Sequence, residues 1–475
     1  MSHYKPYPVY KDSGIEWIGE VPEGWKIISI KCLEGNSANV VQTGPFGAQL
    51  HADDYVDEGV PLILIRNVRD MRIDDTNIPQ VSLSDAERLS MYRLREGDIV
   101  FSRVGSIGRI ALCTERENGW LISGQMLRLR MTNLSVDKKF VAYAFESPSL
   151  LTFVELQSVG STRESINTEI LRNMPLPMPD IIEQREISAF LDRQTAHIDA
   201  LITKKTRFIE LLKEKRQALI THAVTKGLDP NVKMKDSGVE WIGEVPEHWE
   251  RRKLSHAFAK IGSGTTPPSD QPEWYSDDGI PWVTTGELRE SEITKTTKCV
   301  TQRALDQFTT LRVYPKGSLA IAMYGATIGR LGILGVAATT NQACCVLSGG
   351  KSMTVRFVYY WLLVCKQPII EIFAAGGGQP NINQEIISGL RVPSPSIDEQ
   401  DAIAECLDRE VAHLDLITEK TQRSIDLLRE RRSALITAAV TGKIELSGSL
   451  LVIQRIRRNT LSNISFPSLK NRDGW

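Results

Sequence analysis

Apolar residues recur every three or four positions through two long stretches of the chain. They are Ile187, Leu191, Ile198, Leu201, Phe208, Leu212 and Leu219 in the first, and Ile403, Leu407, Leu414, Ile417, Leu428 and Leu435 in the second. This spacing predicts two amphipathic helices of about 40 residues, each about 60 Å long. Polar residues such as Gln194 and Lys205 interrupt the apolar seam. Each helix is therefore expected to pair with one partner without forming an ideal coiled coil.

The regions before each helix contain short runs in which apolar and polar positions alternate, with Gly or Asp at their ends. The runs span residues 61–65, 97–101, 105–108 and 109–112 in the first region, and 280–284, 317–321 and 325–329 in the second. Alternation with a period of two, cut by turn residues, predicts strands and hairpins. A helical segment over residues 84–93 is mixed in. Each region is therefore expected to fold as a compact α+β globule.

Two blocks of the sequence occur twice. Residues 11–22 and 235–246 agree at 11 of 12 positions, and residues 183–225 agree with 399–441 at 23 of 43. Between the blocks the halves diverge, apart from weak echoes such as Ile-Gly-Arg at 107–109 and 328–330. The chain thus runs variable region, repeated helix, variable region, repeated helix. A duplicated module of this kind is suited to a two-part target.

Two nearly identical helices can pack against each other in antiparallel fashion. The variable regions would then lie at opposite ends, related by a pseudo-twofold axis. Such an arrangement suits DNA, because half-sites on one face of the duplex recur every helical turn of about 34 Å. A helical hairpin, or a coil that pairs two copies of the chain, fits the apolar spacing as well, so these alternatives stay open.

Composition is that of an ordinary soluble protein: 475 residues, 41% hydrophobic and 24% charged. The first 13 residues lack the apolar core of a signal peptide. No apolar run approaches the ~18 residues that span a bilayer, and the best, residues 357–365, is too short. Seven scattered cysteines without an export signal fit a reducing cytosol. A cytoplasmic protein that does not contact membranes is expected.

Charge leaves nucleic-acid binding undecided. The formal net charge is −1, whereas a DNA-binding domain is usually markedly basic. The first variable region is nevertheless locally rich in arginine, with Arg66, Arg69, Arg72, Arg88, Arg93, Arg95, Arg103 and Arg109. The last segment, residues 446–475, holds five basic residues and one acidic residue. It is either a terminal extension or a basic tail that touches DNA.

Catalytic motifs are missing from the sequence. It has no HExxH, CxxC, GxSxG or Asn-Pro-Pro-aromatic motif, and Gly350-Lys351-Ser352 lacks the first glycine of a phosphate-binding loop. Glycine-rich spots at 44–47, 262–264 and 376–378 could let a backbone approach phosphates, although simple turns explain each one. His197 and His413 lie on the repeated helices, where a structural role is expected. The chain is therefore predicted not to be an enzyme.

Three repeated motifs together resemble one known family. They are Ser-Gly-x-Glu-Trp-x-Gly-x-x-Pro-x-x-Trp at 13–25 and 237–249, Pro-x-Pro-x-x-x-Glu-Gln at 177–184 and 393–400, and Arg-x-Ala-Leu-Ile-Thr-x-Ala-Val-Thr at 216–225 and 432–441. This combination is similar to that of the specificity (HsdS) subunits of type I restriction–modification systems. The match covers roughly residues 12–445. Residues 446–475 have no counterpart after the first helix.

The resemblance implies a function and a set of partners. In this family each variable domain reads one half of an asymmetric, two-part site in double-stranded DNA. The helices set the spacer and dock modification subunits, two of which are expected here, and restriction/translocase subunits join them. S-adenosylmethionine, ATP and Mg are expected on those partners, with no cofactor and no metal in this chain.

The resemblance also implies five segments. They are a first target-recognition domain at 1–180, a spacer helix at 181–227, a second recognition domain at 228–396, a second helix at 397–445 and a basic tail at 446–475. The expected fold class is α+β, with two α/β recognition domains and the helices packed as an antiparallel coiled coil.

Candidate DNA-contacting residues are polar side chains on the turns of the two variable regions, because Arg reads guanine, Asn or Gln reads adenine, and Ser or Thr read more generally. They are Arg66, Asn67, Arg103, Ser106, Arg109, Thr162 and Arg163 in the first region, and Thr284, Thr285, Tyr324, Thr327, Arg330, Gln379, Asn381 and Asn383 in the second. Arg109 and Arg330 occur in both halves, which favours a phosphate or folding role over base reading.

Two other classes of function compete with this reading. An adaptor with a duplicated coil and two protein-binding domains is favoured by the neutral charge and opposed by the family motifs. A solitary nuclease would need a catalytic site, which the sequence does not show.

Overall fold

The computed structural model describes residues 4–33, 41–45, 49–69, 71–103, 108–148, 152–153, 166–239, 242–373 and 381–446. The chain forms two compact units: unit 1 comprises residues 1–204 and 423–475, and unit 2 comprises residues 205–422. The two long helices are α5 (Ile181–Lys226) and α10 (Ile397–Val440), and each contributes one part to each unit. The unit borders thus fall inside both helices, and the five predicted segment boundaries stay predictions.

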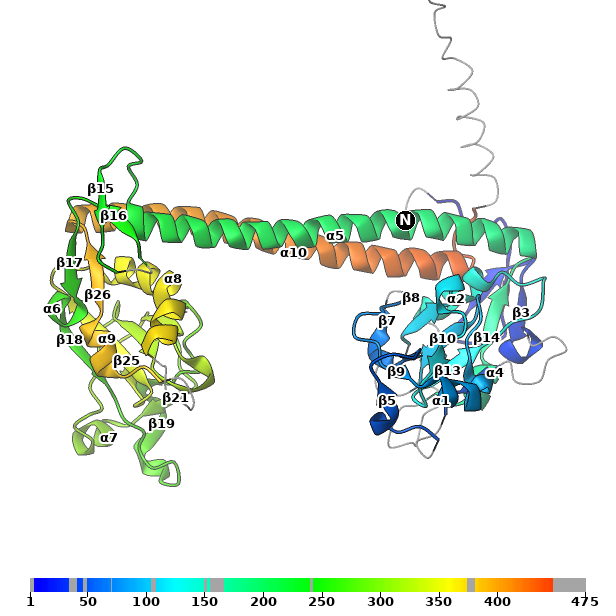
Figure 1. Ribbon diagram of the computed structural model, residues 1–475, viewed down its shortest axis with the longest axis horizontal. Coiled ribbons are helices and arrows are strands. Elements are labelled where there is room, and N and C mark those ends of the chain that lie inside the picture. The colour runs from blue at the N-terminus through cyan, green and yellow to red at the C-terminus, as the bar shows by residue number, and fades with distance from the viewer. Residues whose placement is uncertain are drawn as a thin grey trace, which may run out of the picture. The chain divides into compact units, whose positions relative to one another are not determined.

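Unit 1 is built on two four-stranded sheets, and Figure 1 labels their strands β5, β9, β10 and β13. One has the order β11 (Ile110–Leu112), β10 (Ile99–Ser102), β13 (Met126–Leu129), β4 (Val41–Thr43), and the other β12 (Leu121–Ile122), β6 (Val60–Ile63), β9 (Gln80–Val81), β5 (Tyr55–Val56). Every residue of β10 and β13 is buried. Helix α2 (Lys138–Glu146) contributes Phe140 and Phe145 to the same hydrophobic core. The same unit contains α1 (Leu83–Arg88), α4 (Thr168–Asn173) and a hairpin of β7 (Val68–Arg69) with β8 (Arg72–Ile73).

Unit 2 repeats this plan with longer strands (Figure 1). Its five-stranded sheet has the order β18 (Phe258–Ser263), β25 (Cys344–Gly350), β22 (Leu319–Ala322), β23 (Leu331–Leu334), β20 (Ser291–Ile293), and its three-stranded sheet β21 (Lys298–Val300), β19 (Tyr275–Val283), β24 (Thr339–Thr340). Helices α6 (Leu254–Ala257), α7 (Gln302–Gln307), α8 (Val355–Phe373) and α9 (Gln384–Gly389) complete it. The expected mixture of helix and strand is therefore confirmed. Residues 325–329 do not extend a strand, because Gly325–Thr327 forms one 3-10 turn between β22 and β23.

The first repeated block fixes where each long helix begins. It forms the hairpins β1 (Tyr10–Asp12) with β2 (Glu20–Pro22), and β15 (Met234–Asp236) with β16 (Glu244–Pro246). The buried indole of Trp25 donates to Glu183 at 3.1 Å in unit 1, and that of Trp249 donates to Glu399 at 3.0 Å in unit 2. The strands that follow, β3 (Lys26–Ser29) and β17 (Glu250–Lys253), pair with β14 (Pro175–Met178) and β26 (Arg391–Ser394), the strands that lead into the helices. In each unit, the repeated tryptophan and glutamate thus connect the hairpin to the start of the long helix, and we call this contact the joint of that unit.

We expect the stability of the joint in unit 1 to depend on pH. The Tyr7 hydroxyl donates to Glu183 at 2.5 Å, and burial raises the pKa of the Glu183 carboxyl above its ordinary value of 4.5. The unfolded chain ionises this carboxyl more readily, so its contribution to stability falls as pH rises from 4.5 through the raised pKa. An uncharged acceptor at this position would not show that loss.

We expect Glu183→Gln to flatten the pH dependence of the stability of unit 1. The amide oxygen of the variant can still accept from Tyr7 or Trp25. The free energies of unfolding of variant and wild type should differ by about 1 kcal/mol or less, because the carboxyl is half-exposed. Urea unfolding between pH 4.5 and 8 measures it. The control is Glu23→Gln, at an exposed residue. Parallel stability curves for all three proteins would contradict the expectation.

Within each unit, one part of α5 packs against an oppositely directed part of α10. In unit 1, Arg432 Nε lies 3.0 Å from Asp199, and Ile187 and Leu191 share a hydrophobic core with the last turns of α10. In unit 2, Arg216 Nε lies 3.2 Å from Asp415. Each Arg–Asp pair joins positions that the repeat makes equivalent. Each long helix therefore supplies the arginine to one unit and the aspartate to the other.

The ion pair in unit 1 is more deeply buried than its counterpart. Arg432 Nη1 also lies 2.5 Å from Glu146, and the side chains of Arg432 and Glu146 are 15% and 16% exposed. We expect Arg432→Ala to destabilise unit 1 by about 3 kcal/mol, because it leaves two partly buried carboxylates without their cation. The control is Arg429→Ala, also on α10 in unit 1, whose side chain is 61% exposed. Chemical denaturation compares them, and equal midpoints for both variants would contradict the structural argument.

Candidate nucleic-acid interface

In unit 1, three loops at the ends of buried strands are joined by backbone hydrogen bonds. Ser123 N donates to Ile63 O at 3.0 Å, Arg103 N to Gln125 O at 2.9 Å, and Ile166 N to Arg103 O at 3.0 Å. These bonds place the segments after β6, β10 and β12 beside the segment that enters α4. We call the described residues 64–67, 103, 108–109, 123–125 and 166–167 loop surface 1.

Unit 2 has the same set of bonds at equivalent positions. Asn341 N donates to Val283 O at 3.0 Å, Met323 N to Ala343 O at 2.8 Å, and Ile382 N to Met323 O at 2.9 Å. Loop surface 2 accordingly comprises residues 284–287, 323–330, 341–343 and 381–383. The two variable regions, which share little sequence here, therefore present different side chains on one common backbone framework.

Two glycines hold these surfaces together by close backbone approach. A Cβ atom built on Gly44 would lie 2.1 Å from the carbonyl oxygen of Ser123, and one built on Gly264 would lie 1.7 Å from that of Thr340. Only a residue without a side chain fits at either place. Gly262 is also confined, since its Cβ would meet the Tyr314 hydroxyl at 2.7 Å. Packing against the chain itself explains these glycines, whereas Gly47 and residues 376–378 lie outside the described residues.

Four of the candidate residues of the first region lie together on loop surface 1. Arg66 is exposed and its Nη2 donates to Asn77 O at 3.4 Å, while Arg109 Nη1 lies 3.5 Å from Ile65 O. Arg103 is half-buried, and its Nε has no hydrogen-bond partner among the described residues. Ser106, Thr162 and Arg163 lie outside the part of the chain that the structure describes.

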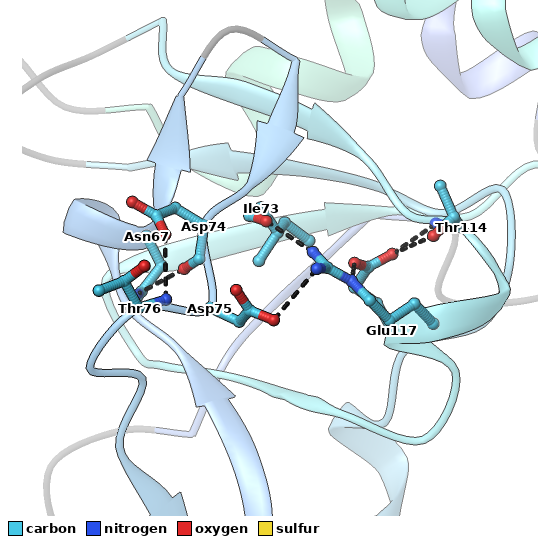
Figure 2. A network of polar contacts seen from close by, with 8 residues as sticks. Asn67, Ile73, Asp74, Asp75, Thr76, Thr114 and Glu117 are labelled. Atoms are coloured by element: carbon cyan, nitrogen blue, oxygen red, sulfur yellow. Dashed lines mark hydrogen bonds and ion pairs between the residues drawn. The ribbon is translucent and has the colours of Figure 1, made fainter.

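Asn67, the fourth, is part of the framework of loop surface 1. It is 2% exposed; its Oδ1 accepts from Leu64 N at 3.1 Å and its Nδ2 donates to Asp74 O at 3.0 Å. Figure 2 shows Asn67 beside Asp74 and Thr76. An amide bonded to the backbone on both sides is not presented to a base edge. The expectation that Asn67 contacts DNA is therefore replaced by a structural role.

The described candidates of the second region share loop surface 2. Tyr324 is 37% exposed and forms a backbone bridge with Asn381, which is also exposed. Asn383 caps α9 by accepting from Ile386 N at 2.8 Å. Thr285, Thr327 and Arg330 lie on the same loops, with Arg330 exposed. Gln379 lies outside the described residues.

Thr284 braces the loop that follows β19. Its backbone N–H donates to Glu287 at 2.7 Å, and its hydroxyl donates to the same carboxylate. Burial acts to raise the pKa of Glu287, but the hydrogen bonds from Thr284 and Thr297 outweigh it and hold that pKa below its usual value. Glu287 thus stays ionised and plays the part that Asn67 plays in unit 1. Both side chains accept the N–H of the first residue after a strand whose last two residues are buried.

Two residues of the loop surfaces, and Thr266 in contact with one of them, escaped the sequence analysis. Gln125 and Gln342 lie exposed in the turns that enter β13 and β25, and the Thr266 hydroxyl donates to Gln342 Oε1 at 2.5 Å. The local signal was a polar turn, Ser-Gly-Gln or Asn-Gln, directly before a buried strand. Thr266 and Gln342 are 76 positions apart in the sequence, so no local sequence pattern could predict their contact.

The groove beside the β7–β8 hairpin in unit 1 is lined by equal numbers of basic and acidic side chains. It has a volume of about 740 Å³ and is lined by Arg69, Arg72, Arg429 and Arg432 together with Asp74, Asp75, Glu146 and Asp199. The four cations balance the four acids. Neighbouring Arg116 donates to Ile73 O, Asp75 and Glu117, and Figure 2 labels these three acceptor residues. Over the described ranges, no three His, Cys, Asp or Glu side chains are placed to hold a metal ion. No helix in that part of the chain could cross a membrane.

Two units that repeat one fold and one loop framework define a two-module recognition protein. The family model described as "Type I restriction modification DNA specificity domain" matches residues 54–211 and 246–425, one match for each half of the chain. The chain belongs to this family, the specificity subunits of type I restriction–modification systems.

Relatives and solved structures agree with this assignment. The putative type I restriction enzyme MjaX specificity subunit of Methanocaldococcus jannaschii is 26% identical, over 90% of this chain and 96% of the relative. The EcoBI specificity subunit of Escherichia coli is 22% identical over 91% and 89%. The HsdS subunit of Thermoanaerobacter tengcongensis shares the fold at 15% identity, covering 89% of this chain and 98% of that one, with a TM-score of 0.53. A chain from a study of type I R-M complex assembly reaches 0.69 at 15% identity, covering 89% and 99%.

Proposed function

We propose that this chain is the DNA sequence-specificity subunit of a type I restriction–modification complex, in which loop surfaces 1 and 2 each read one half of a bipartite site. The observation that carries the proposal is the pairing of one backbone framework with two different sets of exposed side chains. A repeated framework presents both surfaces to the same kind of ligand. Different side chains then make the two half-sites different in sequence, so the whole site is asymmetric.

The long helices connect the two readers. We extend the oppositely directed packing within each unit to a single antiparallel coiled coil over the length of α5 and α10. Such a coil sets the number of unread base pairs between the half-sites. The exposed faces of the helices would dock two modification subunits, and restriction subunits would join the complex.

The chain itself would do no chemistry. In this proposal S-adenosylmethionine is held by the modification subunits, and ATP and Mg by the restriction subunits, all in the cytoplasm. The near-neutral net charge of −1 is compatible with this division, since much of the phosphate contact can come from partners.

The test is a genome-wide map of N6-methyladenine in cells that express the chain with its cognate modification and restriction subunits, against cells that lack only this chain. We expect chain-dependent methylation at one bipartite, non-palindromic motif with an unspecified spacer. A palindromic motif would contradict the reading by two different surfaces. Identical maps would overturn the proposal and favour the adaptor function.

A further inference from the structure

The two loop surfaces contain matched turns with different side chains at the tip. In unit 1, Met126 N donates to Ser123 O at 2.9 Å, and in unit 2, Cys344 N donates to Asn341 O at 3.3 Å. Both turns leave a short strand that runs parallel to its neighbour, and each enters an inner strand of the other sheet of its unit, β13 in unit 1 and β25 in unit 2. The second residue of the turn is Gly124 in unit 1 and Gln342 in unit 2. The same backbone position thus carries no side chain in one unit and a long amide in the other.

The amide of Gln342 is exposed but held in place. The hydroxyl of Thr266 donates to Gln342 Oε1 at 2.5 Å, and both residues face solvent. Thr266 is itself positioned, because Gly264 two residues earlier donates to Thr340 Oγ1 at 3.1 Å and packs against the Thr340 carbonyl. An exposed glutamine normally samples several rotamers. Here a hydrogen bond orients the Gln342 side chain, which makes no other side-chain hydrogen bond among the described contacts.

We infer that Gln342 is a specificity-determining residue that reads an adenine in the half-site of unit 2, with Thr266 as its positioning residue. This inference rests on the proposed function. A glutamine amide reads adenine through two bonds, donating Nε2–H to N7 and accepting the N6 amino group at Oε1. Oε1 has two lone pairs, so the bond from Thr266 leaves one for the base.

The surroundings of Gln342 fit a base contact. Ala343, the next residue, accepts a bond from Met323 N, and Tyr324 follows on that loop in a bridge with Asn381. Exposed polar and aromatic side chains therefore lie on segments next to the turn. Loop surface 1 has Gly124 at the matching point and cannot make the same contact, so this base position should be read in only one half-site.

The experiment uses the complete complex with modification subunits. Methylation is mapped in vivo, and binding is measured to duplexes that carry every single base change in both half-sites. We expect Gln342→Ala to lower discrimination about 10- to 100-fold at one adenine of the unit 2 half-site, and to leave the unit 1 half-site as selective as before. Gln342→Arg should shift the preferred base there from adenine to guanine. Thr266→Val should give a smaller loss at the same base, and Thr266→Ser should restore discrimination.

The control variant is Gln307→Ala, at an exposed glutamine on α7 outside loop surface 2, which should change nothing. A wild-type complex without a bipartite motif would overturn the proposed function and this inference together. A wild-type motif that Gln342→Ala leaves unchanged would overturn the inference alone. Equal weakening on every sequence would also overturn it, because that result assigns Gln342 to phosphate contact or folding. Intact reading of the unit 1 half-site shows that the variant complex is assembled.

Discussion

A chain that stops at Gln422 is expected to lose the folded state of unit 1, although every strand of that unit lies before residue 179. The hydrophobic core of unit 1 takes seven buried residues from the far end of the sequence: Leu435, Ile436, Ala438, Ala439, Val440, Ile444 and Leu446. Burial of one large aliphatic side chain contributes about 1.5–3 kcal/mol. Losing several of them removes about as much free energy as stabilises a whole domain, 5–15 kcal/mol.

Hydrogen exchange followed by mass spectrometry measures this effect, because the amides of β10 and β13 should lose protection in the truncated chain. The matched control stops at Leu446 and keeps every described residue of that core. Unit 2 is continuous in sequence and should stay protected in both chains. Equal protection of β10 in the two chains would show that unit 1 folds without the end of α10.

Because the end of α10 packs into unit 1, the two units have the same elements but a different chain connectivity. In unit 2 the chain passes directly from the end of α5 into the β15–β16 hairpin. In unit 1 the equivalent segments are distant in sequence and meet through contacts: Glu445 N donates to Lys5 O at 2.7 Å, and the Tyr10 hydroxyl donates to Gly442 O at 3.0 Å. Gly442 and Gly227 both have positive φ, 69° and 76°, where each long helix ends. In unit 1, noncovalent contacts therefore connect the end of the long helix to the hairpin, whereas in unit 2 the polypeptide chain itself makes this connection.

The sequence predicted the features that depend on local pattern. The three- and four-residue apolar spacing indicated long helices, observed at Ile181–Lys226 and Ile397–Val440, and the repeat indicated duplication. Alternating runs at 97–101 and 317–321 fall on the central strands β10 and β22. In each case the period of the side chains follows from the geometry of one element, so no distant contact was needed.

What the sequence did not predict depends on contacts between distant positions. Repetition of Trp25 and Trp249 was visible, but their bonds to Glu183 and Glu399 join residues about 150 positions apart. Asn67 has the residue type of a base reader, and only the fold shows that both of its amide groups are bonded to backbone. A polar residue on a turn can serve the turn or a ligand equally well. The difference lies in which groups the tertiary structure leaves unbonded.

Gly264→Ala is expected to destabilise unit 2 by about 3 kcal/mol and to abolish reading of its half-site. The new methyl group would lie 1.7 Å from the carbonyl oxygen of Thr340, and neighbouring strands hold in place the backbone to which each of the two atoms is attached. Relief of the clash must separate the end of β18 from the end of β24. That movement displaces Thr266 and the turn that carries Gln342.

Gly286→Ala is the matched control, because Gly286 lies on loop surface 2, beside which Gly264 packs, and its new Cβ would come no closer than 3.7 Å, to Thr284 Oγ1. Neither glycine has a left-handed φ, so backbone strain does not distinguish the two variants, whereas the clash does. Urea unfolding of both chains and duplex binding by their complexes measure the effect. Gly44→Ala, with 2.1 Å to Ser123 O, should mirror the result in unit 1 and affect only the other half-site. If Gly264→Ala and Gly286→Ala unfolded at the same urea concentration, close backbone approach would not be what holds loop surface 2 together.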